Sequence, residues 1–139
     1  MSATVLYTPD VLMLATELSR WRLEPGFVLA GEARSRSCGS MLRMGVDLDD
    51  QNRIARLGMQ CQACAVGQAA AAIFAGAAVG RSLEAVADSA DAIARWLRGE
   101  GERPDWPRLE IIDAAAAYPG RHGAIMLPWT AASRLLPSD

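Results

Sequence analysis

Three cysteines and one histidine are the residues of this chain whose types best suit metal binding or thiol chemistry. They are Cys38, Cys61, Cys64 and His122. Thiolate sulfur and imidazole nitrogen are zinc ligands, and a thiolate is also a nucleophile. An odd number of cysteines, in a chain that we expect in a reducing compartment, argues against a disulfide framework. Each cysteine is therefore a core residue, a ligand or a reactive thiol.

Two of the cysteines are at positions where we expect the thiol to be able to react or to bind a metal. Cys38 follows a polar run and precedes Gly39-Ser40, in a loop where a thiol is usually accessible. Cys64 opens an alanine-rich segment that we expect to be helical, and the free amide groups at a helix N-terminus stabilise a thiolate. The plainer interpretations are a small loop residue at Cys38 and a thiol packed beneath the sheet edge at Cys64.

Cys61 completes a Cys-Gln-Ala-Cys sequence with Cys64, a spacing typical of metal and redox sites. The alternation of its predicted strand nevertheless puts Cys61 on the inward face with Leu57 and Met59. A free cysteine in that position behaves as a small hydrophobic residue. If the strand ended before Cys61, the thiol would instead turn into the site.

His122 is the single histidine, so no arrangement that needs two histidines can form within one chain. It is either a nitrogen ligand or a surface or capping residue. A set of Cys38, Cys61, Cys64 and His122 would be adequate for zinc and, less commonly, for an iron–sulfur cluster.

The elements that must position these residues begin with a helix and a sheet. Thr8-Pro9 predicts a helix start, with Thr8 as the N-cap. We expect a strand at 27–33. Apolar residues then alternate with a period of two over 41–48 and again over 53–61, and 49–52 forms the turn between these strands. The predicted inward residues of the third strand are Ala55, Leu57, Met59 and Cys61.

Helices are predicted to follow the sheet. The alanine-rich segment 64–79 forms the first, and a second begins after its cap Ser82 and ends at Gly99. The last element spans about 119–136, and Pro128 suggests that its helix begins only a few residues before that proline. The fold class is therefore α+β, with a three-stranded antiparallel sheet packed against several helices.

Composition narrows the class of protein. At 139 residues and 51% hydrophobic content, residues 1–139 fit one domain. The sequence contains no run of about 18 uninterrupted apolar residues, which a membrane span would need. The N-terminus lacks the charged region of a signal peptide. We therefore expect a cytoplasmic protein. The net charge of −2 gives no electrostatic footprint for nucleic acid. Every basic residue is arginine, which excludes a lysine nucleophile.

Short motifs spread over nearly the whole chain resemble those of one known family. They are Ser37-Cys38-Gly39-Ser40 before an alternating strand, Cys64 before the alanine-rich helix, Val79-Gly80-Arg81-Ser82, Tyr118-Pro119-Gly120-Arg121 and Leu127-Pro128-Trp129. In this order and spacing they are similar to the IscU/SufU (NifU N-terminal-like) family of iron–sulfur cluster assembly scaffolds.

The resemblance implies both a function and a set of site residues. In that family three cysteines and an aspartate, or a nearby histidine, hold an iron–sulfur cluster or zinc, and a cysteine desulfurase delivers sulfur to one thiol. It therefore implies Cys38 and Cys64 as cluster or metal ligands and Cys38 as a sulfur acceptor. Cys61 and His122 are additional candidate ligands. The implied role is that of a non-enzymatic scaffold or sulfur carrier that works with a desulfurase or other assembly proteins.

Two positions depart from the family pattern. The aspartate position holds Ser40, a poor metal ligand, and the third cysteine position falls on Ala124, which cannot coordinate a metal. Two thiolates per chain could still bridge a cluster across a homodimer, or a partner could complete the site.

Two other functions stay open. A metal-free interaction module would keep the scaffold fold and bind an assembly partner without carrying iron or zinc. A thiol-redox enzyme would use Cys61 and Cys64, although the inward position of Cys61 disfavours it.

Overall fold

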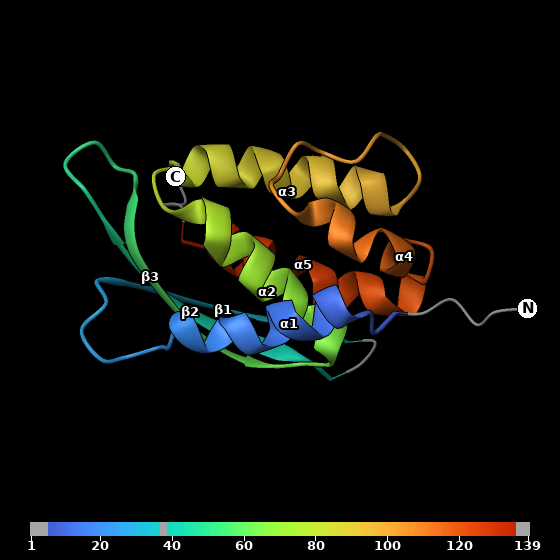
Figure 1. Cartoon of the computed structure of the whole chain (residues 1–139). Coiled ribbons are helices and arrows are strands. Elements are labelled where there is room, and N and C mark those ends of the chain that lie inside the picture. Colours follow the sequence, from blue (N-terminus) through green and yellow to red (C-terminus); the bar gives the residue numbers. More distant parts are fainter. Residues whose placement is uncertain (1–5, 37–38, 136–139) are drawn as a thin grey trace, which may run out of the picture.

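The computed structural model describes residues 6–36 and 39–135, and within them five α-helices accompany one three-stranded sheet. Helices α2 and α5 contact the sheet, and α3 packs on α5 farther from it (Figure 1). This arrangement confirms the predicted α+β fold class. The elements are α1 (Pro9–Glu17), η1 (Leu18–Arg20), β1 (Leu29–Arg34), β2 (Met41–Leu48), β3 (Ile54–Gln62), α2 (Ala65–Ala78), α3 (Leu83–Leu97), η2 (Leu109–Ile112), α4 (Asp113–Ala116) and α5 (Pro119–Ser133).

The sheet is an antiparallel meander in the order β1-β2-β3. In the central strand Leu42, Met44 and Val46 are at most 1% exposed, whereas Arg43 between them is exposed. Side chains alternate between the two faces of a strand, so the predicted period of two is confirmed for β2. Its apolar face lies against the helices.

One inward residue of β3 was predicted wrongly. Ala55 is exposed, and Ile54 is buried in its place. The ladder is irregular here, because Asp47 pairs with Arg56 while the next residue, Leu48, pairs with Ile54. An extra residue in one strand reverses the alternation on its far side. The bulge therefore turns Ala55 outward and Ile54 into the core, next to the turn.

Side-chain caps fix the starts of two helices as predicted. The Thr8 hydroxyl accepts a hydrogen bond from the Val11 N–H at 3.1 Å, and the Ser82 hydroxyl accepts one from the Ala85 N–H at 3.0 Å. Such caps satisfy amide groups that have no partner within the helix.

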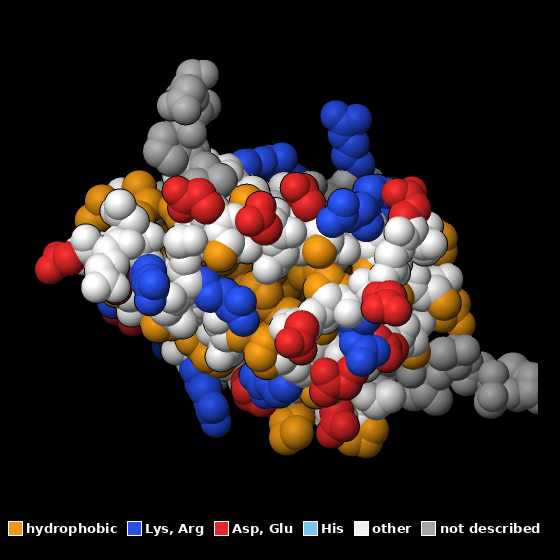
Figure 2. Space-filling model, turned by 90° about the horizontal axis from the view of Figure 1, so that it is seen from above, with side chains coloured by type: hydrophobic (Ala, Val, Ile, Leu, Met, Phe, Trp, Pro, Cys, Tyr) orange, Lys and Arg blue, Asp and Glu red, His pale blue; other side chains and the backbone are white. Residues whose placement is uncertain are grey.

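Seen from above, the surface over α3 mixes acidic and basic side chains around a hydrophobic hollow (Figure 2).

Helix α5 does not begin near Pro128. It starts at Pro119 and continues through Pro128 to Ser133, so the predicted late start is wrong. A proline inside a helix removes the N–H that would bind the carbonyl four residues earlier, here that of Ala124. Leu127, Pro128 and Trp129 are all buried, and we attribute the tolerance of this lost bond to their packing.

Three aromatic residues join the elements at the centre of the core. The Phe74 ring stacks on Trp106 at a centroid distance of 5.7 Å, and Trp129 meets both rings edge-on at 5.5 and 5.3 Å. The Trp106 indole N–H donates to the Ile73 carbonyl at 2.9 Å. This cluster ties α2 and α5 to the loop before η2.

No helix among the described residues is long and apolar enough to cross a membrane.

Candidate thiol site at one end of the sheet

Strand register brings two separate segments to the same end of the sheet. Met41, the first residue of β2, pairs with Arg34 at the end of β1 and with Gln62 at the end of β3. Ser40 therefore adjoins the segment that leads to Cys64. Cys38 lies outside the described residues. We call the region of Ser40, Cys61, Cys64 and Ala124 the thiol end.

Cys64 is the N-cap residue of α2, as the sequence predicted. Its backbone is extended (φ −64°, ψ 170°), its side chain is half-buried, and its carbonyl accepts the Gln68 N–H at 2.9 Å. The side chain makes no capping hydrogen bond. A thiolate at this position would lie near the partial positive charge of the helix N-terminus.

Two residues of α2 that sequence reasoning missed hold the turn before Cys64. The Gln68 side-chain amide donates to the Ala63 carbonyl at 2.9 Å. A Cβ added at Gly67 would lie 2.7 Å from the Cβ of Ala63, so only glycine fits without moving the turn. Glycine and glutamine in the first turn of an otherwise alanine-rich helix were the available sequence signal. The Gln68 hydrogen bond and the close approach of Gly67 to Ala63 restrain the backbone that carries Cys64.

Cys61 lies in β3 opposite Leu42 and packs, half-buried, against the hydrophobic core. Burial raises the pKa of its thiol to about 11, and the neighbouring Cys64 adds to the effect. The thiol is therefore protonated at neutral pH. Because β3 continues to Gln62, the strand does not end before Cys61, which was the condition for turning this thiol into the site.

The two departures from the family pattern are both buried at this end. Ala124 is fully buried on α5, and its Cβ lies 3.2 Å from the position of a Cβ added at Gly67. Ser40 is 5% exposed, and its carbonyl accepts the Ser35 N–H at 2.8 Å. At Ala124, the position at which the sequence resemblance implies a third cysteine, a methyl group packs against α2.

His122 points to a different part of the fold. Its Nε2 lies 2.6 Å from the Ala116 carbonyl oxygen, and its side chain lines a cavity of about 200 Å³ together with Leu97 and Met126. That cavity lies between α3 and α5. Among the described residues, no three His, Cys, Asp or Glu side chains come together in a way that would hold a metal ion. The structure thus does not bring His122 together with Cys61 and Cys64.

Comparison with solved structures defines the class of fold. The chain has the fold of the IscU/SufU/NifU-type iron–sulfur scaffolds, as the sequence resemblance implied. It matches a NifU-like protein (N-terminal) from Brucella abortus with a TM-score of 0.84 and 21% identity, over 94% of this chain and 91% of that one. No protein-family model matches the sequence, and no curated protein matches it.

A second solved structure is similar over nearly all of this chain and the whole of the other. A putative iron–sulfur cluster assembly scaffold protein for the SUF system from Fervidobacterium islandicum AW-1 matches with a TM-score of 0.83 and 17% identity. The match covers 98% of this chain and 100% of that one. At this level of identity the likeness establishes the fold, and the site must be argued from its own residues.

The donor atoms at the thiol end do not make a complete cluster site. The described thiols are Cys61 and Cys64, and Ala124 contributes no donor. An iron–sulfur cluster is normally held by four ligands, mostly thiolates. The described residues therefore supply too few ligands to hold a cluster unaided.

Proposed function

We propose that this protein acts in iron–sulfur cluster assembly, as a scaffold or sulfur acceptor that works with a cysteine desulfurase. The observation that carries the proposal is the strand register, which puts Ser40, two residues after Cys38, at the end of the sheet where Cys64 caps α2. The fold it shares with a SUF-system scaffold supports the same role.

In this proposal the reaction at the thiol is sulfur transfer between proteins. A deprotonated acceptor, Cys38 or Cys64, attacks the outer sulfur of a persulfide on the donor. A new sulfur–sulfur bond forms on the acceptor, the sulfur–sulfur bond of the donor breaks, and the donor leaves as a thiolate that takes up a proton. Amide groups at the start of α2 would stabilise negative charge on Cys64.

Any cluster or zinc ion would be shared. Because Ala124 and Ser40 stand where the resemblance implies two ligands, a second copy of the chain or a partner protein would supply the missing donors. Two thiolates from each of two chains would provide the four ligands that a cluster needs. Cys61 and His122 stay candidate ligands that rest on sequence alone.

A second function is favoured by the same replacements. A metal-free interaction module would need the fold and its surface but no donors at 40 and 124, and the buried methyl group of Ala124 suits that role. In this case the protein binds an assembly partner, and loss of both thiols leaves binding unchanged.

Sulfur transfer is tested by incubating the protein with a cysteine desulfurase and L-cysteine, then locating added sulfur by peptide mass spectrometry. We expect added sulfur on Cys38 or Cys64, lost in the matching Cys38→Ser or Cys64→Ser variant and retained in the control Cys61→Ser. Anaerobic purification with iron, sulfide and zinc analysis tests the shared site. Desulfurase binding without any sulfur transfer or bound metal would favour the interaction module instead.

A further inference from the structure

A groove of about 450 Å³ lies on the face of the sheet that points away from the helices. Gly31 of β1 faces α5, because a Cβ added there would lie 2.9 Å from the carbonyl oxygen of Ala131 in α5. Its neighbours Ala30 and Glu32 therefore face outward. We call this feature the outer groove, and the residues that define it are Leu23, Phe27, Ala30, Glu32, Arg43 and Gly45.

Phe27 forms the apolar wall of the outer groove. Its ring lies directly on two glycines of the sheet, since an added Cβ would come within 2.5 Å of it at Gly45 and within 2.8 Å at Gly58. The Arg56 guanidinium stacks over the ring at 4.1 Å and pairs with Asp47 at 2.8 Å. Contacts with both the sheet and Arg56 fix the ring in place.

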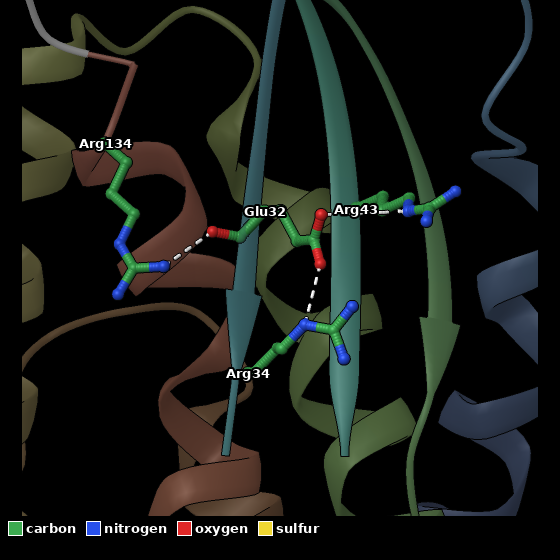
Figure 3. Close-up of polar contacts among 4 residues, drawn as sticks. All are labelled: Glu32, Arg34, Arg43 and Arg134. Atoms are coloured by element: carbon green, nitrogen blue, oxygen red, sulfur yellow. Dashed lines mark hydrogen bonds and ion pairs between the residues drawn. The ribbon is translucent and has the colours of Figure 1, made fainter. Parts of the chain in front are cut away.

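Arginines border one side of the outer groove. The Glu32 carboxylate lies 2.9 Å from Arg34 Nε and 3.9 Å from Arg43 Nε, and Arg134 donates to the Glu32 carbonyl oxygen at 2.8 Å (Figure 3). Two guanidinium groups beside one carboxylate leave one positive charge in excess at Glu32. Arg34 and Arg43 have side chains that are 68% and 54% exposed.

We propose that the outer groove is a docking site for an extended acidic peptide segment of a partner protein. A large apolar side chain of the segment packs against Phe27 and Ala30. Its carboxylates bind Arg34 and Arg43, whose planar guanidinium groups can each hold a carboxylate through two hydrogen bonds.

Charge argues for an acidic protein segment over other occupants. The whole chain carries a net charge of −2, and the surface over α3 shows both signs (Figure 2), so the excess at Glu32 is local. Nucleic acid would place a line of phosphates along the groove, where Glu24 and Glu32 repel them. A peptide can place its carboxylates on the arginines alone.

The test measures binding of a fluorescein-labelled peptide of glutamates around one tryptophan, by fluorescence anisotropy with the full-length protein. We expect saturable binding that weakens by about tenfold, or about 1.4 kcal/mol, in Arg43→Glu. Arg95→Glu is the matched control, because it makes the same charge change on α3, and it should bind like the wild type. Ala30→Leu should also weaken binding, since it fills the groove.

Other outcomes of the same binding experiment would contradict the proposal. Equal loss of binding in Arg43→Glu and Arg95→Glu would show a general charge effect. Undiminished binding of a peptide with glutamines for glutamates, or tighter binding of a single-stranded oligonucleotide, would remove the acidic peptide as the occupant. Cys64→Ser should bind the peptide normally, so this result is independent of whether sulfur transfer occurs.

Discussion

The thiol end and the outer groove are two regions of one sheet, and small residues serve opposite purposes in them. At the thiol end, Gly67 and Ala124 bring α2 and α5 into contact, and Ala124 occupies the position at which the sequence resemblance implies a third cysteine. On the outer face, Gly45 and Gly58 leave space that Phe27 occupies. In the first region a packed methyl group stands where the resemblance implies a donor, whereas in the second region packing builds the proposed binding surface. We infer that thiol chemistry and partner binding can change independently in this fold.

We expect the largest loss of stability when a new side chain fills the space under Phe27. In Gly58→Ala the new Cβ would lie 2.5 Å from the Arg22 carbonyl oxygen and 2.8 Å from the Phe27 ring. We expect a loss of about 3 kcal/mol in the free energy of unfolding, because a backbone atom must move. Urea unfolding measures it. Gly120→Ala is the control: nothing lies within 4 Å of its added Cβ, so it should be neutral or stabilising.

Adding a side chain at the thiol end should cost less stability but move the thiol. Gly67→Ala places a Cβ 2.7 Å from Ala63 Cβ, and the better helix propensity of alanine offsets about 1 kcal/mol of the strain. We expect a net loss of about 1 kcal/mol. The alkylation rate of Cys64 should change, because the turn that carries it shifts. An unchanged rate in Gly67→Ala, with Gly120→Ala as the reference, would show that the turn does not control the thiol.

Much of this comparison could not be read from the sequence. The alternation over 41–48 and the caps at Thr8 and Ser82 are local signals, so the fold class and most element starts were predictable. The bulge at Ala55 was missed because it depends on how two strands pair. The continuation of α5 through Pro128 was missed because buried packing outweighs one lost hydrogen bond.

The candidate site was predictable only in part, for a related reason. Cys64 could be placed at a helix start from local sequence, and Cys61 from its strand phase. The direction of His122 depends on the contact between α3 and α5, which no local pattern encodes. The outer groove depends on three segments that meet in space, with Phe27 lying across glycines of β2 and β3. Residue types alone gave no sign of that contact.

Differential alkylation should separate the two described thiols of the thiol end. With a pKa of about 11 in place of 9.0, Cys61 has about a hundredfold less thiolate at pH 8 than an unperturbed cysteine. We expect iodoacetamide to modify Cys61 slowly at pH 8 and faster as the pH approaches 11. Peptide mass spectrometry follows each site. Rapid modification of Cys61 at pH 8 would contradict its burial and revive the thiol-redox function.

The same shift has a consequence for stability. Unfolding returns the pKa of Cys61 to its ordinary value, so the unfolded state loses its proton first as the pH rises. The Cys61 contribution to the free energy of unfolding should therefore fall between about pH 9 and 11. Cys61→Ala should lose this part of the pH dependence. An identical alkaline slope in the variant and the wild type would assign the effect to other groups.

We expect the smallest change in stability when the Asp47–Arg56 ion pair beside the outer groove is removed. The Asp47 carboxylate accepts the Val28 N–H at 2.8 Å and pairs with Arg56, and both interactions lower its pKa below 3.8. A lowered pKa stabilises the fold above the unfolded value, and this contribution disappears as the pH falls through the folded value. Because the carboxylate is still partly exposed to solvent, Asp47→Asn should reduce stability only slightly at pH 7 and by less at pH 2.

The Asp47→Asn substitution also tests whether the thiol end and the outer groove are independent of each other. Arg56 stacks on Phe27, so freeing it in Asp47→Asn should loosen the wall of the outer groove and weaken binding of the acidic peptide. The alkylation rates of Cys61 and Cys64 should not change, since the substitution lies at the opposite end of β2. A parallel change in thiol reactivity would show that the sheet couples the two regions, and the independence argued above would then fail.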